Sequence, residues 1–413
     1  MIAELSFIAL ALAIGIPLAL RLSAPPREPF SRAGEGMLIG IGICAATLVL
    51  LPWSRWLVIA VILLIAAIAW TRSAAEPPRS YGAILVLALL LGYALYATVA
   101  PPPEYDYLTN WGFKAKAFFE IRAIDWRLLE SPPDSSVHAD YPLLLPLTYD
   151  FIGVLRNGWN DAHLGVVHVA FAAALLLIIH ASSLQETHSR LAAAFIAIAL
   201  IPLAATPWIG LAEGPFIAYA TASLLAIRRG DVILGAVLLG LAASTKNEGL
   251  ALIVAVAIGL LCAGRKRDVL RLWPALAIAM PWLIARLALR LPTDIATDGV
   301  IARMIEHARD PAGFVAALAS FHLGKPLYWI GLAAGMAITF RTIITRERFV
   351  LIALLVQFVS YLGAYLATPF GVLWHVTWSW ERLVAHLTPA LTYVVLVQLV
   401  GTVVTARTHP THS

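Results

Sequence analysis

The feature that most constrains this chain is a succession of apolar runs, each approaching the length needed to cross a lipid bilayer. Residues 3–20 and 81–100 are examples, and about 20 apolar residues span the hydrocarbon core. Hydrophobic residues make up 61% of the 413 residues and charged residues only 13%. Roughly a quarter of a soluble domain is charged. The sequence therefore predicts an all-α polytopic membrane protein.

We expect about 13 transmembrane helices from the apolar runs. The segment 141–155 is short and has prolines near its start, so we interpret it as a re-entrant or juxtamembrane helix. The predicted spans lie near 3–20, 37–53, 56–71, 82–100, 161–180, 191–207, 212–227, 231–245, 249–263, 271–288, 314–340, 349–367 and 383–404.

Arginines in the short loops predict the orientation, because cytoplasmic loops carry an excess of Lys and Arg. With 13 spans, the clusters at 21–32, 72–79, 228–229, 265–267 and 341–348 all fall on one side, the predicted cytoplasmic side. The expected regions are N-terminal helices 1–100, an outer catalytic loop with juxtamembrane or re-entrant helices 101–160, a helical bundle 161–404 with a second outer loop 289–313, and a cytoplasmic tail 405–413.

Two functional classes are disfavoured by the pattern. The net charge is +5, but no basic tract is interleaved with aromatic residues, so we expect no nucleic-acid partner. No internal repeat stands out, although many transporters are built from internal repeats. The ionisable residues also gather near the ends of predicted spans rather than at their centres, which a polar transport pathway would require.

Two acids, Glu104 and Asp106, stand in the stretch EYDYLTNW, directly after an apolar run. In a non-helical stretch, carboxylates at i and i+2 can point to the same side. A partly desolvated carboxylate near a membrane surface can act as a general base toward an alcohol. The pair could also hold a divalent cation, although nothing in the sequence requires a metal or another cofactor. The alternative, favoured by spacing alone, is two solvated acids at a helix end.

The long outer loop returns to the membrane at HADYPLLLP, which offers His138, Asp140 and Tyr141. Pro142 restricts the backbone of the residue before it, so turn formation explains part of this stretch. Turn formation accounts less well for Asp140. We therefore treat the stretch as a candidate contributor to a site at the outer surface.

Three further stretches place charges at predicted helix ends. Glu213 lies in an otherwise apolar stretch, where a carboxylate usually faces a polar cavity or a partner, or caps a helix N-terminus. Lys246 and Glu248, in STKNEG, either pair with each other or leave Lys246 as a counter-ion for a phosphate. Arg382 could bind a phosphate through two hydrogen bonds or simply reach to the interface. Under the predicted topology all these charges share the outer face, which favours one outward-facing site.

The order and character of these elements resemble the C-type superfamily of integral-membrane glycosyltransferases, in particular bacterial relatives of the protein mannosyltransferase and aminoarabinose transferase group. EYDYLTNWGFKAKAFFE resembles the acidic motif of the first catalytic outer loop, and HADYPLLLPL resembles the return motif of that loop. LAEGPFIAYA and GLAASTKNEGLAL resemble an acid at a helix start and a later Gly-Leu-Ala-x-x-Thr-Lys pattern. WSWERLVAHLTPAL resembles the stretch that opens a late helix. The resemblance covers 100–260 and 370–400.

The resemblance implies a helical bundle with juxtamembrane helices, a polyprenyl-phosphate sugar donor and an inverting reaction. The catalytic acid of the family maps to Asp106, with Glu104 as the substitute. The chain departs from better-known members, because four predicted spans precede the catalytic loop and no sizeable soluble domain is expected after the last span. Basic outer residues are implied as phosphate contacts: Lys246, Arg382, Lys114 and Lys116.

The sequence therefore predicts a glycosyltransferase of the inner membrane, with its active site on the periplasmic face and Asp106 as the general base. The acceptor would be a hydroxyl of a glycan, a lipid or a protein. The alternatives are a ligase that moves a whole glycan from a pyrophosphate carrier, a polytopic transporter, and a non-catalytic member of an assembly complex. The expected substrate-binding residues are Asp140, His138, Tyr141, Glu213, Lys246, Glu248, Arg382 and Lys114.

Overall fold

The computed structural model describes residues 2–23, 29–70, 104–204, 209–293, 299–319 and 326–408. All regular secondary structure in these ranges is helical, as the sequence predicts. The first elements are α1 (Ile2–Leu22), α2 (Pro29–Leu50), α3 (Arg55–Trp70), the π-helix η1 (Tyr107–Trp111), α6 (Gly112–Ile121), α7 (Trp126–Glu130), the 3-10 turn η2 (Ser135–Val137), α8 (Leu144–Arg156), α9 (Val166–Thr187) and α10 (Arg190–Ala204).

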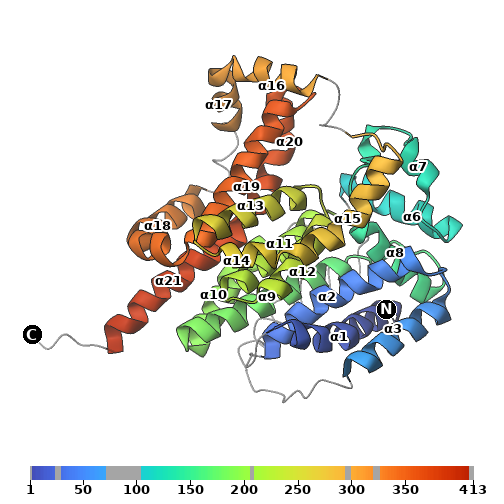
Figure 1. Ribbon diagram of the computed structural model, residues 1–413, viewed down its shortest axis with the longest axis horizontal. Coiled ribbons are helices and arrows are strands. Elements are labelled where there is room, and N and C mark those ends of the chain that lie inside the picture. The colour runs from blue at the N-terminus through green and yellow to red at the C-terminus, as the bar shows by residue number, and fades with distance from the viewer. Residues whose placement is uncertain are drawn as a thin grey trace, which may run out of the picture.

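The second half of the chain continues the helical arrangement (Figure 1). Its elements are α11 (Glu213–Arg228), α12 (Val232–Ala243), α13 (Glu248–Cys262), α14 (Lys266–Leu270), α15 (Trp273–Ala288), α16 (Val300–Ala308), α17 (Pro311–Ala319), α18 (Pro326–Arg346), α19 (Arg348–Ala367), α20 (Val372–Ala385) and α21 (Thr388–Thr408).

Seven candidate spans in the described part of the chain are long and apolar enough to cross a membrane, and four shorter apolar helices accompany them. The predicted count of 13 spans is not confirmed. The expected span 82–100 lies outside the described residues. The expected span 314–340 is two helices, α17 and α18. Pro326 opens α18, a position where proline is favoured because the first turn needs no N–H donor.

Large apolar side chains cover the outward faces of several helices. Leu63 and Leu64 on α3, Val254 on α13, and Ile330 and Ile338 on α18 are all exposed. Soluble monomers rarely expose such surface over so many elements. Since lipid tails can cover these faces, the exposure and the apolar helices together indicate a polytopic membrane protein.

Small residues allow the first two helices to pack closely. Gly36 and Gly40 lie four residues apart on α2, and a Cβ added to Gly40 would come within 1.9 Å of the Ala11 carbonyl oxygen on α1. A Cβ at Gly15 would come within 1.7 Å of the Gly36 carbonyl oxygen. This spacing of small residues is typical of close helix contacts in membranes.

Helix α11 lies at the centre of the bundle and organises the polar groups. Its residues from Glu213 to Ile227 are buried, and it packs against α9, α12 and α21. At 1.5 Å per residue, its first and last residues lie about 22 Å apart along the axis. Its two ends therefore hold two separate polar clusters, described below. Arg228 is the last residue of α11 and Arg229 follows it; both are charges predicted to lie on the inner side.

The described part of the segment predicted as the outer loop, 104–160, contains short helices. Tyr107 and Trp111 of η1 are buried, and the ring of Trp111 meets that of Tyr141 at a centroid distance of 5.5 Å. The Tyr107 hydroxyl donates a hydrogen bond to Asp161 Oδ1 (2.6 Å). Burial and this carboxylate raise the pKa of Tyr107 above its ordinary value, so the hydroxyl stays protonated. Helix α8, only 13 residues long, packs on α1, α2 and α6.

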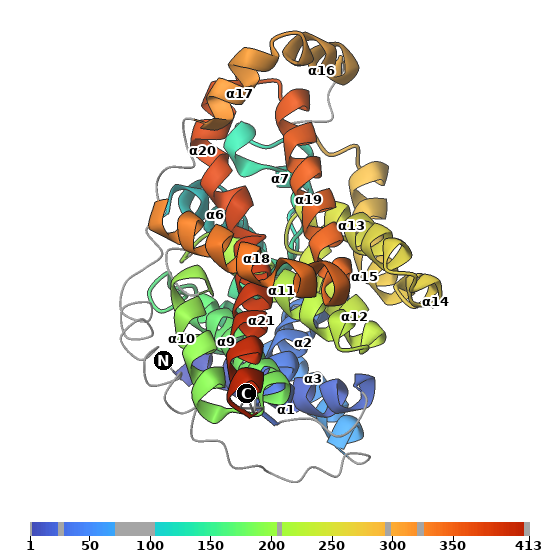
Figure 2. The same ribbon diagram turned by 90° about the vertical axis from the view of Figure 1, so that its left-hand side faces the viewer.

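The last predicted span, 383–404, differs from the structure. The chain forms α20, turns at His386–Leu387, and continues as α21, with Pro389 as the second residue of that helix. Arg382 therefore lies in the last turn of α20 rather than at the start of the final helix. In Figure 2, α16, α17 and the adjoining ends of α19 and α20 project beyond the rest of the bundle.

Candidate active site

The first residue of α11, Glu213, is the centre of a charged network. Its side chain is fully buried, and its Oε1 accepts hydrogen bonds from Lys246 Nζ (2.8 Å) and Arg382 Nε (2.7 Å). The sequence left open whether Glu213 caps the helix. The side chain makes no such cap, since it is occupied by the two cations.

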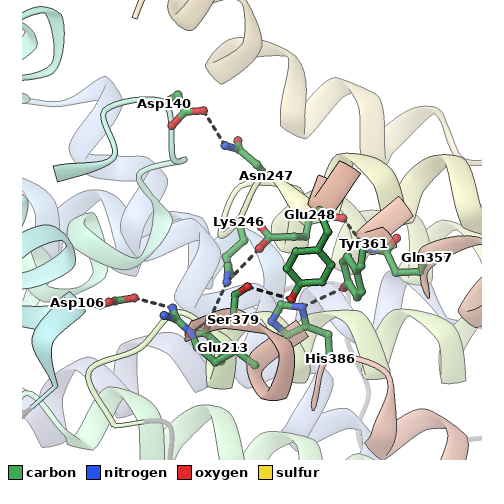
Figure 3. A network of polar contacts seen from close by, with 12 residues as sticks. Asp106, Asp140, Glu213, Lys246, Asn247, Glu248, Gln357, Tyr361, Ser379 and His386 are labelled. Carbon is green, nitrogen blue, oxygen red and sulfur yellow. Dashed lines mark hydrogen bonds and ion pairs between the residues drawn. The ribbon is translucent and has the colours of Figure 1, made fainter. Parts of the chain in front are cut away.

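Arg382 connects this buried centre to the outer loop. Its Nη2 donates to Asp106 Oδ2 at 2.5 Å, joining residues 276 positions apart in the sequence (Figure 3). The Arg382 side chain is 30% exposed and that of Asp106 is 21% exposed. Arg382 therefore bridges a buried carboxylate, Glu213, and a partly accessible one, Asp106.

Lys246 belongs to the buried part of the network. It lies in the turn between α12 and α13, is 3% exposed, and also pairs with Glu248 Oε1 at 3.2 Å. Burial lowers the pKa of Lys246, but the carboxylates of Glu213 and Glu248 outweigh that effect and raise it above its ordinary value. Of the two interpretations from the sequence, the pairing of Lys246 with Glu248 is present in the structure. The other, Lys246 as a counter-ion for a phosphate, is disfavoured because Glu213 and Glu248 already match its charge.

A further ion pair, between Asp140 and Arg286, lies beside the charged network, and only Asp140 was predicted from the sequence. Asp140 Oδ2 accepts from Asn247 Nδ2 (3.1 Å) and pairs with Arg286 Nη2 (3.3 Å). Trp282 Nε1 donates to the Asp140 backbone carbonyl (3.3 Å). The sequence singled out Asp140 but missed Arg286 and Asn247. The available signal was Arg286 itself, a charge inside an otherwise apolar run.

The outer loop is joined to the same turn through its backbone. Leu144 N donates to the Ser244 carbonyl (3.1 Å), which ties the start of α8 to the Ser244–Gly249 turn. Together with the Asp106 and Asp140 ion pairs, this bond is one of several contacts that attach the 101–160 segment to the bundle. The loop and the charged network thus form one structural unit.

Glu104 does not join the network, which corrects one expectation. Asp106 has helical backbone angles (φ −62°, ψ −29°) and precedes η1, so the stretch is not extended. Residues at i and i+2 of a helical turn do not face each other. Among the described residues Glu104 contributes only its backbone carbonyl, which accepts from Tyr107 N and Leu108 N. The two acids are therefore not a shared ligand pair.

Other predicted residues make contacts within the loop. Lys114 is fully buried, donates to the His138 carbonyl (3.2 Å), and lies 5.1 Å from the centroid of the Trp111 ring. The His138 ring packs against Tyr141. Lys116 is exposed on the surface of α6. These contacts of Lys114 and His138 thus lie within the loop.

A buried polar pair lies behind the network and was not foreseen. Tyr361 OH and His386 Nδ1 are 3.0 Å apart, and Gln357 Nε2 donates to the Glu248 carbonyl (3.1 Å) (Figure 3). His386 follows Arg382 by one helical turn, in a stretch whose arginine had drawn attention instead. These contacts hold α19 and α20 against the start of α13.

The groups available for chemistry are few. Asp106 and Arg382 are the most accessible charges of this network, Glu248 is 16% exposed, and Glu213 and Lys246 are buried behind them. Glu213 Oε2 and Glu248 Oε2 accept no hydrogen bond from any residue in the described ranges. Within those same ranges, no group of three or more His, Cys, Asp or Glu side chains is arranged to hold a metal ion. The divalent cation allowed by the sequence stays a prediction.

No protein-family model, no curated protein and no solved structure matches this chain. The resemblance to membrane glycosyltransferases therefore rests on the sequence motifs alone and stays a prediction.

Proposed function

We propose that the protein is a membrane glycosyltransferase that moves a sugar from a polyprenyl-phosphate donor to an acceptor hydroxyl. The observation that supports this most is the contact between Asp106 and Arg382 at 2.5 Å, because it places a carboxylate beside a guanidinium at the edge of a buried charged network. Such a transfer needs one group to accept a proton and another to stabilise a leaving phosphate.

Asp106 would act as the general base. As the acceptor oxygen attacks the anomeric carbon of the sugar, its proton passes to the Asp106 carboxylate, which contributes about 10²–10⁴-fold to such reactions. The new bond joins the acceptor oxygen to the anomeric carbon, and the bond from that carbon to the phosphate oxygen breaks. The lipid phosphate leaves with the electron pair, and a single displacement inverts the anomeric centre.

Arg382 would stabilise the departing phosphate. Its guanidinium is partly exposed, and arginine can bind phosphate oxygens through two parallel hydrogen bonds. Lys246 was the other main phosphate candidate, but it is buried and held by Glu213 and Glu248. We therefore assign Lys246 and Glu213 to positioning Arg382, and the phosphate to Arg382 itself.

The membrane setting fits this substrate class. A polyprenyl chain needs an apolar surface beside the reacting phosphate, and the helices around the network expose large apolar side chains to the surrounding lipid. The predicted inner-side arginines Arg228 and Arg265 lie at the opposite end of α11, where Arg265 Nη2 donates to the Ile227 carbonyl (2.9 Å). We propose that the Asp106 end faces the periplasm, the inner membrane being the predicted location.

The test is release of lipid phosphate by the purified protein. A panel of polyprenyl-phosphate sugars is supplied with mixed glycan, lipid and peptide acceptors, and wild type is compared with Asp106→Asn and Glu104→Gln. We expect wild type to release lipid phosphate, Asp106→Asn to lose about a thousandfold in rate, and Glu104→Gln to stay active. Equal rates for wild type and a folded Asp106→Asn would contradict the assigned base. Polyprenyl-pyrophosphate-linked glycans are supplied in parallel, and release of lipid pyrophosphate from these alone would identify a ligase, whereas no release from any donor would favour a transporter.

A further inference from the structure

We infer that the donor phosphate and Asp106 compete for Arg382, so that binding of the donor releases Asp106 to serve the acceptor. This inference rests on the proposed function. It starts from a conflict in the structure: the carboxylate assigned as base has one oxygen already committed to the arginine that is assigned to the phosphate. Exchange of that contact would free Asp106 Oδ2 for the acceptor and Arg382 Nη2 for the phosphate.

The two carboxylates on Arg382 differ in how firmly they are held. Glu213 is buried, lies on the central helix α11, and is shared with Lys246. Asp106 is partly exposed, and its contact with Arg382 is its single side-chain contact within the described part of the chain. A rotation about the short Asp106 side chain is enough to break that contact, while Glu213 would keep Arg382 in place through Nε.

The charges of the network favour exchange over addition. Asp106, Glu213 and Glu248 face Arg382 and Lys246, so three carboxylates already share two cations. A sugar linked through a phosphodiester carries one negative charge. If it replaces Asp106 on Arg382 Nη2, the arginine keeps two anionic partners and the phosphate gains a position for a forked contact with the guanidinium. Adding it without exchange would crowd three anions around Arg382, at a cost in repulsion.

The neighbouring Asp140–Arg286 pair offers a contrast within the same loop. Asp140 is 5% exposed, its carboxylate is also held by Asn247, and its backbone carbonyl accepts from Trp282. Breaking this pair would leave the Asp140 carboxylate, 7% exposed, without its cation. The Asp140 pair is therefore a fixed attachment, whereas the Asp106 pair is the one that can open.

The exchange sets an order of events. The acceptor hydroxyl meets a free Asp106 carboxylate only after a donor occupies Arg382. A water molecule or an acceptor that enters the site without a donor finds Asp106 engaged. Donor binding and the release of Asp106 from Arg382 thus become one step. The general base is therefore free only when the sugar–phosphate bond that will break is present in the site.

Equilibrium binding of an unreactive phosphodiester tests the inference. The probe is farnesyl methyl phosphate, which has one negative charge and no sugar to transfer, and its dissociation constant is measured by fluorescence for each folded variant. We expect Asp106→Asn to bind about tenfold more tightly than wild type, because the competing anion is gone. Arg382→Gln should bind at least about tenfold more weakly.

Two matched variants separate competition from a general charge effect. Glu104→Gln removes the same charge two residues away without touching Arg382, and we expect it to change the affinity by less than about twofold. Asp140→Asn removes the carboxylate of the fixed pair and should not tighten binding. Equal tightening in Glu104→Gln and Asp106→Asn would overturn the exchange, as would unchanged or weaker binding in Asp106→Asn.

The result also separates this inference from the proposed function. If wild type releases lipid phosphate from sugar donors but Asp106→Asn binds the probe no more tightly than wild type, the exchange is wrong and the glycosyltransferase stands. If wild type neither binds the probe nor releases lipid phosphate, both are wrong. An Asp106→Ala variant measured alongside confirms that the effect follows from loss of the carboxylate rather than from the asparagine side chain.

Discussion

The two ends of α11 both gather charges, but they do so in different ways. At the Arg228 end, called the inner end after its predicted side, Arg228 is enclosed by Glu186 and Glu347, donating to Glu347 Oε2 at 2.5 Å and to Glu186 Oε2 at 2.7 Å. Neutral donors complete both carboxylates: Tyr393 OH reaches Glu186 (2.6 Å) and Gln398 Nε2 reaches Glu347 (2.7 Å). At the outer end, by contrast, Glu213 and Glu248 each keep one oxygen that accepts nothing from the described residues.

The difference teaches what each cluster can do. The inner cluster joins α9, α11, α19 and α21, and Arg229 adds α2 through Glu35 (2.6 Å). Its hydrogen bonds are nearly complete, so it has little capacity left for a ligand. The outer cluster has accessible charges and spare acceptor oxygens. We therefore interpret the inner cluster as a structural attachment and the outer cluster as the reactive site.

The largest effect on folding is expected at the inner end. Glu347→Gln removes a carboxylate that is 1% exposed and leaves Arg228 with one partner. Removing one member of a buried ion pair costs about 3–5 kcal/mol. We expect a clear fall in the unfolding midpoint in detergent, with lipid-phosphate release per folded molecule nearly unchanged. A loss of activity in folded Glu347→Gln would mean that the inner end also takes part in the reaction.

Glu213→Gln should affect both properties, because Glu213 supports the outer site from within the bundle. The change leaves Lys246 and Arg382 with one fewer carboxylate, and we expect a loss of about 2–3 kcal/mol in stability together with slower turnover. Thermal unfolding and initial rates measured on the same preparation give the two numbers. Normal turnover in a destabilised Glu213→Gln would remove Glu213 from the positioning role.

Arg286→Gln tests the fixed attachment of the outer loop. Asp140 would keep its hydrogen bond from Asn247, so the loss should be about 1–2 kcal/mol. Because the loop carries Asp106, we expect limited proteolysis of the segment around Asp140 to accelerate more than the unfolding midpoint falls. A variant as resistant as wild type would show that the remaining contacts of the loop, among them the Asp106 pair and the Leu144 backbone bond, suffice to hold it.

Glu104→Gln should have the smallest effect. Its side chain joins no ion pair among the described residues, so stability should stay within about 0.5 kcal/mol and turnover within about threefold of wild type. Initial rates and an unfolding curve are enough to check it. A severe loss of turnover would return Glu104 to the list of candidate bases and weaken the contrast between the two acids.

Much of the site's composition could be predicted from sequence, but not its connections. Charges at the ends of apolar runs pointed to Asp106, Glu213, Lys246 and Arg382, and the structure brings these side chains together. Partners could not be read from the chain, because the contacts join residues 33, 169 and 276 positions apart. Arg286 was missed because a single charge in an apolar run does not indicate which residue it pairs with.

Several helix boundaries differ from the prediction because of single residues. Glu104 and Asp106 were expected in a non-helical stretch, whereas Asp106 has helical backbone angles. Apolar content alone also joined α17 to α18 and extended the last span back to residue 383. In both cases the new helix has a proline in its first two residues: Pro326 is the first residue of α18, and Pro389 is the second residue of α21. Fold class is set by apolar runs, whereas helix boundaries depend on such single residues.

The most direct test of the account compares Asp106→Asn and Glu347→Gln side by side, with lipid-phosphate release per folded molecule as the measurement. We expect Asp106→Asn to unfold at nearly the temperature of wild type and to be almost inactive, while Glu347→Gln unfolds earlier and keeps its activity. If the two variants lose activity to the same degree, or if Asp106→Asn is fully active, the outer end of α11 is not the reactive site.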